Sequence, residues 1–129
     1  MITEFVRGFS LFAPAAQTVT ANGAGVDLVA MGGDHAVVSL HLGVVSGTTP
    51  TLDVKIQDSA DNSTFADFAT PVAFTQKTVG ASFSRLNLNI ANVRRYVRAV
   101  VTITGTTPVF NMAVVMHAED SIVPTALQP

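Results

Sequence analysis

Residues 44–56 read VVSGTTPTLDVKI, and residues 102–114 read TITGTTPVFNMAV. Each stretch contains an apolar alternating run, the tetrapeptide Gly-Thr-Thr-Pro and a second alternating run. The glycine of each tetrapeptide, Gly47 or Gly105, can adopt the positive φ that a tight turn needs. The proline cannot donate to a β-ladder, so it belongs at or just before the first residue of a strand. The two stretches therefore predict two β-hairpins with matched turns.

Alternating apolar and polar residues predict further short strands along the chain. No segment of helical length shows a period of 3.6 residues, and Asn22-Gly23 is a strong signal for a further hairpin turn. We therefore expect an all-β fold, an antiparallel β-sandwich of about eight strands. The expected strands are residues 17–21, 26–30, 35–45, 51–57, 65–68, 82–90, 94–103 and 109–117.

The phase of the alternation predicts which side chains face the core. On one face of the predicted strands lie residues of a single apolar set: Ala36, Val38, Leu40, Leu42, Val44, Leu52, Val54, Ile56, Val97, Ala99, Val101 and Ile103. Strand 109–117 is apolar on both faces, which is typical of a central strand or of one covered by another chain.

The ends of the chain lack this alternation, which divides the sequence into three parts. Residues 1–16 are predicted to be an N-terminal arm or a first strand, residues 17–117 the sandwich domain, and residues 118–129 a C-terminal tail. The arm carries Phe5, Phe9 and Phe12, which need cover and are candidate partner-binding residues. If it is an arm, removing residues 1–12 is expected to leave the sandwich folded.

Charge is scarce in this chain of 129 residues. Charged residues make up 12% of the sequence, against about 25% in ordinary soluble domains. Two interpretations fit this composition: a surface rich in serine, threonine, asparagine and glutamine, or a surface partly buried in an assembly. The net charge of −2 argues against a nucleic-acid binder, and no apolar run is long enough for a membrane-spanning helix.

The sequence offers little catalytic chemistry. It contains no cysteine, no Gly-x-Ser-x-Gly motif and no phosphate-binding loop, so we expect no enzyme activity, no catalytic residue and no cofactor. His35, His41 and His117 lack the spacing of metal ligands and are expected to be solvated or at an interface. The segment of residues 58–64 contains Asp58 and Asp61, but it fits a polar turn better than a calcium loop, and no metal site is predicted.

Three arginines form the main basic cluster. Arg94, Arg95 and Arg98 lie within five residues, although the whole chain has seven lysine and arginine residues. One interpretation is a clamp that binds an acidic partner through the bidentate guanidinium fork. The alternative is a set of ion pairs within the chain, with Asp27, Asp53 or Asp58 as partners. These arginines are candidate partner-binding residues.

A longer succession of motifs resembles a known group of proteins. It runs from Asp27-Leu28 through residues 47–67 (GTTPTLDVKIQDSADNSTFAD) to residues 95–108 (RYVRAVVTITGTTP). Small virion proteins of tailed bacteriophages, encoded among the head genes, show a similar order of strands and turns. The resemblance covers roughly residues 26–116 and is a pattern of strands and turns rather than a catalytic motif.

The resemblance implies a jelly-roll-like β-sandwich that decorates and cements a phage capsid. It implies binding to the outer surface of the major capsid protein, commonly as a homotrimer, by a protein made in the host cytoplasm and located in the virion. A head–tail connector or tail component is the alternative. A carbohydrate-binding or adhesion sandwich is a third, but the chain has no tryptophan and one tyrosine to stack on sugars. Nothing here points to nucleic acid or membrane as a partner.

Overall fold

The computed structural model describes residues 6–28, 35–89 and 93–119, and these residues form strands and no helix. The all-β prediction is confirmed. Seven strands are present within the described ranges rather than about eight, because two pairs of predicted strands merge into longer ones and the N-terminal segment forms an additional strand. They are β1 (Val6–Gln17), β2 (Ala21–Asn22), β3 (Val26–Asp27), β4 (His35–Ser59), β5 (Ala66–Ala73), β6 (Ser82–Asn89) and β7 (Tyr96–Glu119).

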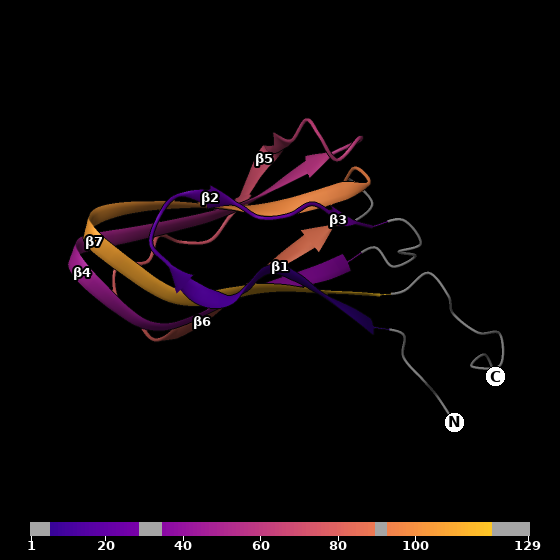
Figure 1. The fold of residues 1–129 in the computed structure, drawn as a ribbon. Helices are drawn as coiled ribbons and strands as arrows, with labels where there is room; N and C mark the ends of the chain where they lie inside the picture. Colours follow the sequence, from indigo (N-terminus) through magenta and orange to yellow (C-terminus); the bar gives the residue numbers. More distant parts are fainter. Residues whose placement is uncertain (1–5, 29–34, 90–92, 120–129) are drawn as a thin grey trace, which may run out of the picture.

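Two long strands, β4 and β7, form the framework of the molecule. They contain 25 and 24 residues and pair antiparallel almost from end to end, from Ala36 opposite Ala118 to Ser59 opposite Tyr96. Both strands bend at their middle, so that the two-stranded ribbon folds in half and its halves face each other (Figure 1). The antiparallel β-sandwich that the sequence predicts is therefore built on one folded ribbon.

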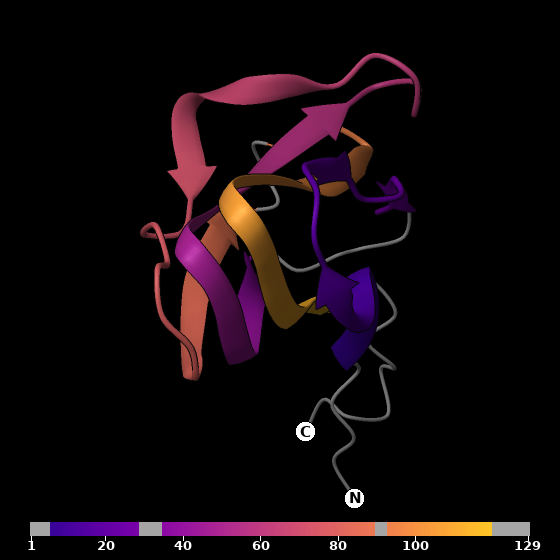
Figure 2. The ribbon, with the colours of Figure 1, turned by 60° about the vertical axis from the view of Figure 1, so that its left-hand side comes forward.

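The shorter strands extend each half of this ribbon into a layer. Layer A contains β6, residues 35–45 of β4, residues 109–119 of β7, and β1, in that order. Layer B contains β5, residues 51–59 of β4 and residues 96–104 of β7, with β2 and β3 paired to β7 on the far side. Figure 2 shows the short strands on the two sides of the folded ribbon.

The core lies between the two layers and follows the predicted alternation. The buried side chains come from every second residue of β4 and β7, as expected for strands with one buried face. Val44 is an exception, because the register shifts between Leu42 and Val45 and leaves its side chain 72% exposed. Apart from Val44, every residue of this set is buried. On the apolar phase of residues 82–90, Leu88 is also buried, whereas Leu86 is only partly buried.

The two Gly-Thr-Thr-Pro stretches were predicted to be hairpin turns, and this prediction is wrong. Each lies in the middle of a continuous strand, and they pair with each other, with Thr48 opposite Thr106 and Thr51 opposite Thr104. The positive φ values are present, 112° at Gly47 and 117° at Gly105. The positive φ values occur where two neighbouring strands bend, and not in a loop that connects two strands.

The prediction of a hairpin turn at Asn22-Gly23 is also wrong. Strands β2 and β3 on either side of it both pair with β7 and not with each other. The amide of Gly23 donates to the carbonyl oxygen of Ala99 at 2.7 Å, and a Cβ atom at Gly23 would lie 2.5 Å from the carbonyl oxygen of Leu11. Glycine is needed here because two backbones approach closely, not because the chain reverses.

The N-terminal segment belongs to the sandwich. Residues 6–17 form β1, which pairs with β7 along the edge of layer A. Leu11 and Phe12 of this strand are part of the core. For residues 6–16 the first-strand alternative therefore replaces the arm. Phe5, and residues 120–129 of the predicted tail, lie outside the described residues.

Candidate partner-binding surfaces

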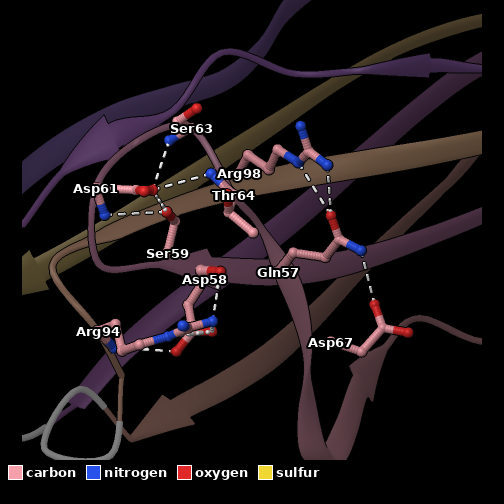
Figure 3. A network of polar contacts seen from close by, with 9 residues as sticks. All are labelled: Gln57, Asp58, Ser59, Asp61, Ser63, Thr64, Asp67, Arg94 and Arg98. Carbon is pink, nitrogen blue, oxygen red and sulfur yellow. Dashed lines mark hydrogen bonds and ion pairs between the residues drawn. The ribbon is translucent and has the colours of Figure 1, made fainter.

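Arg94 and Asp58 form an ion pair at the start of β7 (Figure 3). The Arg94 Nη2 atom donates to Asp58 Oδ1 at 2.8 Å and to the Asp58 carbonyl oxygen at 3.0 Å, and the Arg94 backbone N–H donates to Oδ2 at 3.0 Å. Burial of Asp58 raises its pKa, but the hydrogen bonds and the charge of Arg94 outweigh burial and lower the pKa overall.

Arg95 forms a bidentate ion pair with Asp27 at the end of β3. Its Nε and Nη2 atoms donate to the two carboxylate oxygens at 2.9 and 2.8 Å, and its guanidinium also lies 5.1 Å from the centre of the Tyr96 ring. Both partners are partly exposed, so this pair contributes little to stability. The intrachain alternative thus fits Arg94, with Asp58, and Arg95, with Asp27.

Arg98 lies on the outer face of layer B in a chain of polar contacts. Its Nε and Nη2 atoms donate to Gln57 Oε1 at 3.0 and 2.8 Å, and its guanidinium lies 4.3 Å from the centre of the Phe65 ring. Gln57 in turn donates to Asp67, which also pairs with Lys55 (Figure 3 shows the Arg98–Gln57–Asp67 part). Partner binding by the three arginines stays a prediction, but the Nε and Nη2 atoms of each already donate to acceptors within the chain.

The segment of residues 58–64 is a self-contained polar turn. The Asp61 carboxylate accepts hydrogen bonds from the backbone N–H groups of Thr64 and Ser63, both at 2.9 Å, and from the Ser59 hydroxyl at 2.8 Å. These hydrogen bonds lower the pKa of Asp61 to about 2. Within residues 6–28, 35–89 and 93–119, no group of three or more His, Asp or Glu residues is arranged to hold a metal ion.

The described phenylalanines of the N-terminal segment face inward. Phe12 is 9% exposed in the core, and Phe9 is partly buried against it. Phe12 therefore packs within its own chain and is not presented to a partner. Phe9 and Phe5 as partner contacts stay predictions.

The outer face of layer A differs sharply from that of layer B. Layer B carries Asp53, Lys55, Gln57 and Arg98, whose charges and amides are engaged by neighbours in the chain. On layer A, Arg85 is the only formally charged side chain among those that the structure describes. The other outward residues of layer A are small, apolar or neutral: Gly8, Ser10, Val37, Ser39, His41, Phe83, Asn87, Ala113, Val115 and His117.

His41 and His117 lie on this outer face, as the strand phases predicted, and His35 shares the phase of His41 at the start of β4. His41 is opposite Phe83 of β6 and Ala113 of β7, whereas His117 is opposite Val37 of β4. The His41 ring meets the Phe83 ring edge-on, with centroids 5.6 Å apart. Their strands pair, but the two histidines are not opposite each other in the register.

The described part of the sandwich surface includes two depressions of similar size. One, of about 390 Å³, lies on the outer face of layer A beside His41 and is lined by residues of β1, β4 and β7. The other, of about 370 Å³, lies between the edge strands β5 and β6, and its lining includes Phe68, Val72, Leu88 and Val93. No sequence motif pointed to either depression. Phe83 could have been noticed, because it shares the outward phase of Arg85 and Asn87.

The described part of the chain contains no helix that is long and apolar enough to cross a membrane.

No protein-family model matches the sequence, and no curated protein matches it. Two solved structures share the fold. The SPBc2 prophage-derived protein YomS superposes with a TM-score of 0.55 at 14% identity, over 93% of this chain and 97% of that chain. A chain in the structure of the infectious bursal disease virus Gx strain gives a TM-score of 0.55 at 11% identity, over 90% of this chain but 32% of the viral chain. At these identities the likeness is one of fold.

Proposed function

We propose that this protein is a structural component of a bacteriophage virion, and that it decorates and cements the capsid. It would bind the outer surface of the major capsid protein and associate with further copies of itself. The succession of motifs over residues 26–116 supports the virion assignment. The same fold in a prophage-derived protein and in part of a viral protein agrees with it.

The observation that carries the assembly part of the proposal is the contrast between the two outer faces. Layer B satisfies its own charges, whereas layer A presents a broad face with one formal charge among its described side chains. A face depleted of charge is typical of the central part of a protein interface. The low charged fraction of the whole chain, 12%, favours the same interpretation.

Cementing follows from thermodynamic linkage. A protein that binds the assembled shell, and not the separated subunits, shifts the equilibrium toward the shell. Many copies multiply a small contribution from each contact. The folded ribbon suits this task, because β4 and β7 each run through both layers and tie the sandwich into one body.

The proposal can be tested with phage heads assembled without this protein. We expect saturable co-sedimentation of many copies per head, and a higher temperature for shell rupture once the protein is bound. Binding of only a few copies at one vertex would favour the connector or tail alternative. Heads that neither bind the protein nor gain stability would contradict the proposal.

A further inference from the structure

A row of residues crosses the outer face of layer A from bulky to small. It begins at Phe83 on β6, passes His41 on β4 and ends at Ala113 on β7, because His41 is opposite both of the others in the register. The side chain of Phe83 is 59% exposed and stands edge-on against the His41 ring. A large and mostly exposed apolar side chain thus lies on one side of His41.

On the other side of His41 lies the depression of about 390 Å³. Its lining contains Pro14, Ala15 and Ala16 of β1, Gly43 of β4 and Ala113 of β7, together with His41 itself. None of its lining residues carries a formal charge. A shallow apolar hollow therefore lies next to an apolar projection on the same face.

Two further exposed valines lie near this row of residues. Val44 and Val79 are 72% and 71% exposed, and Gly80 lies so close to β4 that a Cβ atom there would be 2.1 Å from the Gly43 carbonyl oxygen. Val79 is thereby held beside the segment that carries Val44. With Phe83 they account for three of the four large exposed apolar side chains in the described ranges, and all three lie around residues 41–45 of β4.

We propose that two copies of this chain pack together through the outer faces of layer A, around a two-fold axis near His41. The Phe83 ring of each copy fills the hollow beside Ala113 of the other. A two-fold contact needs a surface that is complementary to itself, and an apolar projection beside an apolar hollow meets that need. This inference rests on the self-association in the proposed function and specifies its contact surface. The contact involves two copies of this chain and no capsid protein.

The size and charge of the face fit a second copy. Four strands spaced about 4.8 Å apart, with about nine residues of about 3.3 Å each, cover roughly 600 Å² per copy. A pair would bury roughly 1,200 Å², at the lower end of specific interfaces. Arg85 lies at β6, an edge strand of layer A, so a formal charge need not be buried at the centre of the contact.

A disulfide experiment tests the contact directly. Residues 83 and 113 of one copy are separated by two strand spacings, about 10 Å, which exceeds the ~7 Å limit between Cα atoms for a disulfide. The natural chain has no cysteine, so in the double variant Phe83→Cys/Ala113→Cys any disulfide must join two copies. We expect this variant to become a covalent dimer on mild oxidation, seen on a non-reducing gel. An equal mixture of the two single variants should do the same.

The control pair is Val19→Cys/Ala113→Cys. Val19 is also a strongly exposed valine, but it lies in the link between β1 and β2. If the test pair gives no more covalent dimer than this control, the proposal is overturned. A ladder of covalent trimers and larger species would overturn the two-fold arrangement, because a head-to-tail contact does not close on two copies.

Light scattering gives a second readout without cysteines. The natural protein should have the mass of a dimer over a concentration series, and Val19→Ser should remain a dimer. Phe83→Ser should move the protein to the monomer, which should still melt cooperatively but without the stabilisation that the dimer contact supplies. A monomer that still decorates heads would refute this contact and leave the proposed function in place. A dimer that ignores heads would support the contact and refute the proposed function.

Discussion

Asp58 is the one charged side chain that is buried within the described ranges. It is surrounded by donors from Arg94, both side chain and backbone, so its charge is compensated where β7 begins. This pair fixes the end of the folded ribbon, because Asp58 lies near the end of β4 and Arg94 lies just before β7.

Replacing Asp58 by asparagine should therefore destabilise the fold. We expect a loss of about 2 kcal/mol in the free energy of unfolding, below the ~3–5 kcal/mol typical of a fully buried pair, because Arg94 is half exposed. Urea unfolding at neutral pH measures it. The control is Asp67→Asn, which removes the exposed pair with Lys55 and should destabilise the fold much less. Equal effects of the two substitutions would show that burial of Asp58 is irrelevant.

The lowered pKa of Asp61 makes the free energy of unfolding depend on pH in the acid range. Its pKa in the folded protein is about 2, whereas an unfolded aspartate has a pKa of about 3.9. Since the folded-state pKa is the lower of the two, this contribution is complete above about pH 4 and is lost as the pH falls toward 2. The lowered pKa of Asp58 acts in the same direction.

The substitution Asp61→Asn isolates this effect. The amide oxygen can still accept hydrogen bonds from Thr64 and Ser63, but it does not titrate in this range. We expect the melting temperature of the variant to fall less steeply than that of the natural protein between about pH 4 and about pH 2. Parallel pH profiles would contradict the assignment.

At the scale of elements, the bend of the ribbon depends on two glycines. A Cβ atom on Gly47 would lie 2.7 Å from the Thr107 carbonyl oxygen, and one on Gly105 would lie 2.9 Å from the Thr49 carbonyl oxygen. Each glycine also has a positive φ, and so do Thr49 and Thr107. The two tetrapeptides contact each other in nearly the same way, so they are equivalent parts of one bend.

Alanine at either glycine should therefore be similarly damaging. We expect Gly47→Ala and Gly105→Ala each to cost about 2–3 kcal/mol, from the strained φ and the backbone contact together. The matched control is Gly8→Ala, where a Cβ atom would lie 3.5 Å from the His117 ring, in ordinary contact. Its unfolding free energy should change by less than about 0.5 kcal/mol. A tolerant Gly47 or Gly105 in chemical denaturation would contradict the equivalence of the two sites.

Strand β1 is expected to be necessary for folding, and truncation of the N-terminus tests this. Removing residues 1–12 deletes Leu11 and Phe12 from the core, and each large apolar side chain lost from a core costs about 2–5 kcal/mol. The total approaches the whole stability of a small domain, so the shortened protein should fail to fold cooperatively. Removing residues 1–5 leaves β1 intact and should preserve cooperative melting. A folded protein lacking residues 1–12 would restore the arm interpretation.

The sequence predicted the strands better than their connections. Alternation identified Leu52, Val54 and Ile56 as inward and Lys55 and Gln57 as outward, because a half-buried strand imposes a two-residue period. Gly-Thr-Thr-Pro was misread because a turn and a bend within a strand both need positive φ. Only the pairing of the two tetrapeptides distinguishes them, and that pairing spans 58 residues of sequence.

The candidate surfaces were harder to foresee. The arginine cluster was visible in the sequence, but its partners Asp27 and Asp58 come from distant strands. The hollow beside His41 combines β1, β4 and β7, and no local pattern brings these strands together. Phe83 was detectable as an outward aromatic, yet its partner His41 follows only from the register of β4 and β6.

The two outer faces of the sandwich differ in how many charged side chains they carry and in how these are paired. On layer B, ion pairs and amide contacts within the chain engage the charged side chains, whereas the described side chains on the outer face of layer A include a single formal charge, on Arg85. Deep in the groove between β5 and β6 lies Leu88, which is 2% exposed. The proposed decoration role would need a stable body and a surface that remains available for assembly, and the contrast between the two outer faces is consistent with that need.

The most direct test of the account is the number of copies that bind to one head. Heads assembled without the protein would be saturated with it, separated from the unbound protein by sedimentation, and weighed by light scattering. The account predicts many copies on each head, in a fixed ratio to the major capsid protein. A head whose mass does not change would contradict the capsid role and leave a β-sandwich whose assembly partner lies elsewhere.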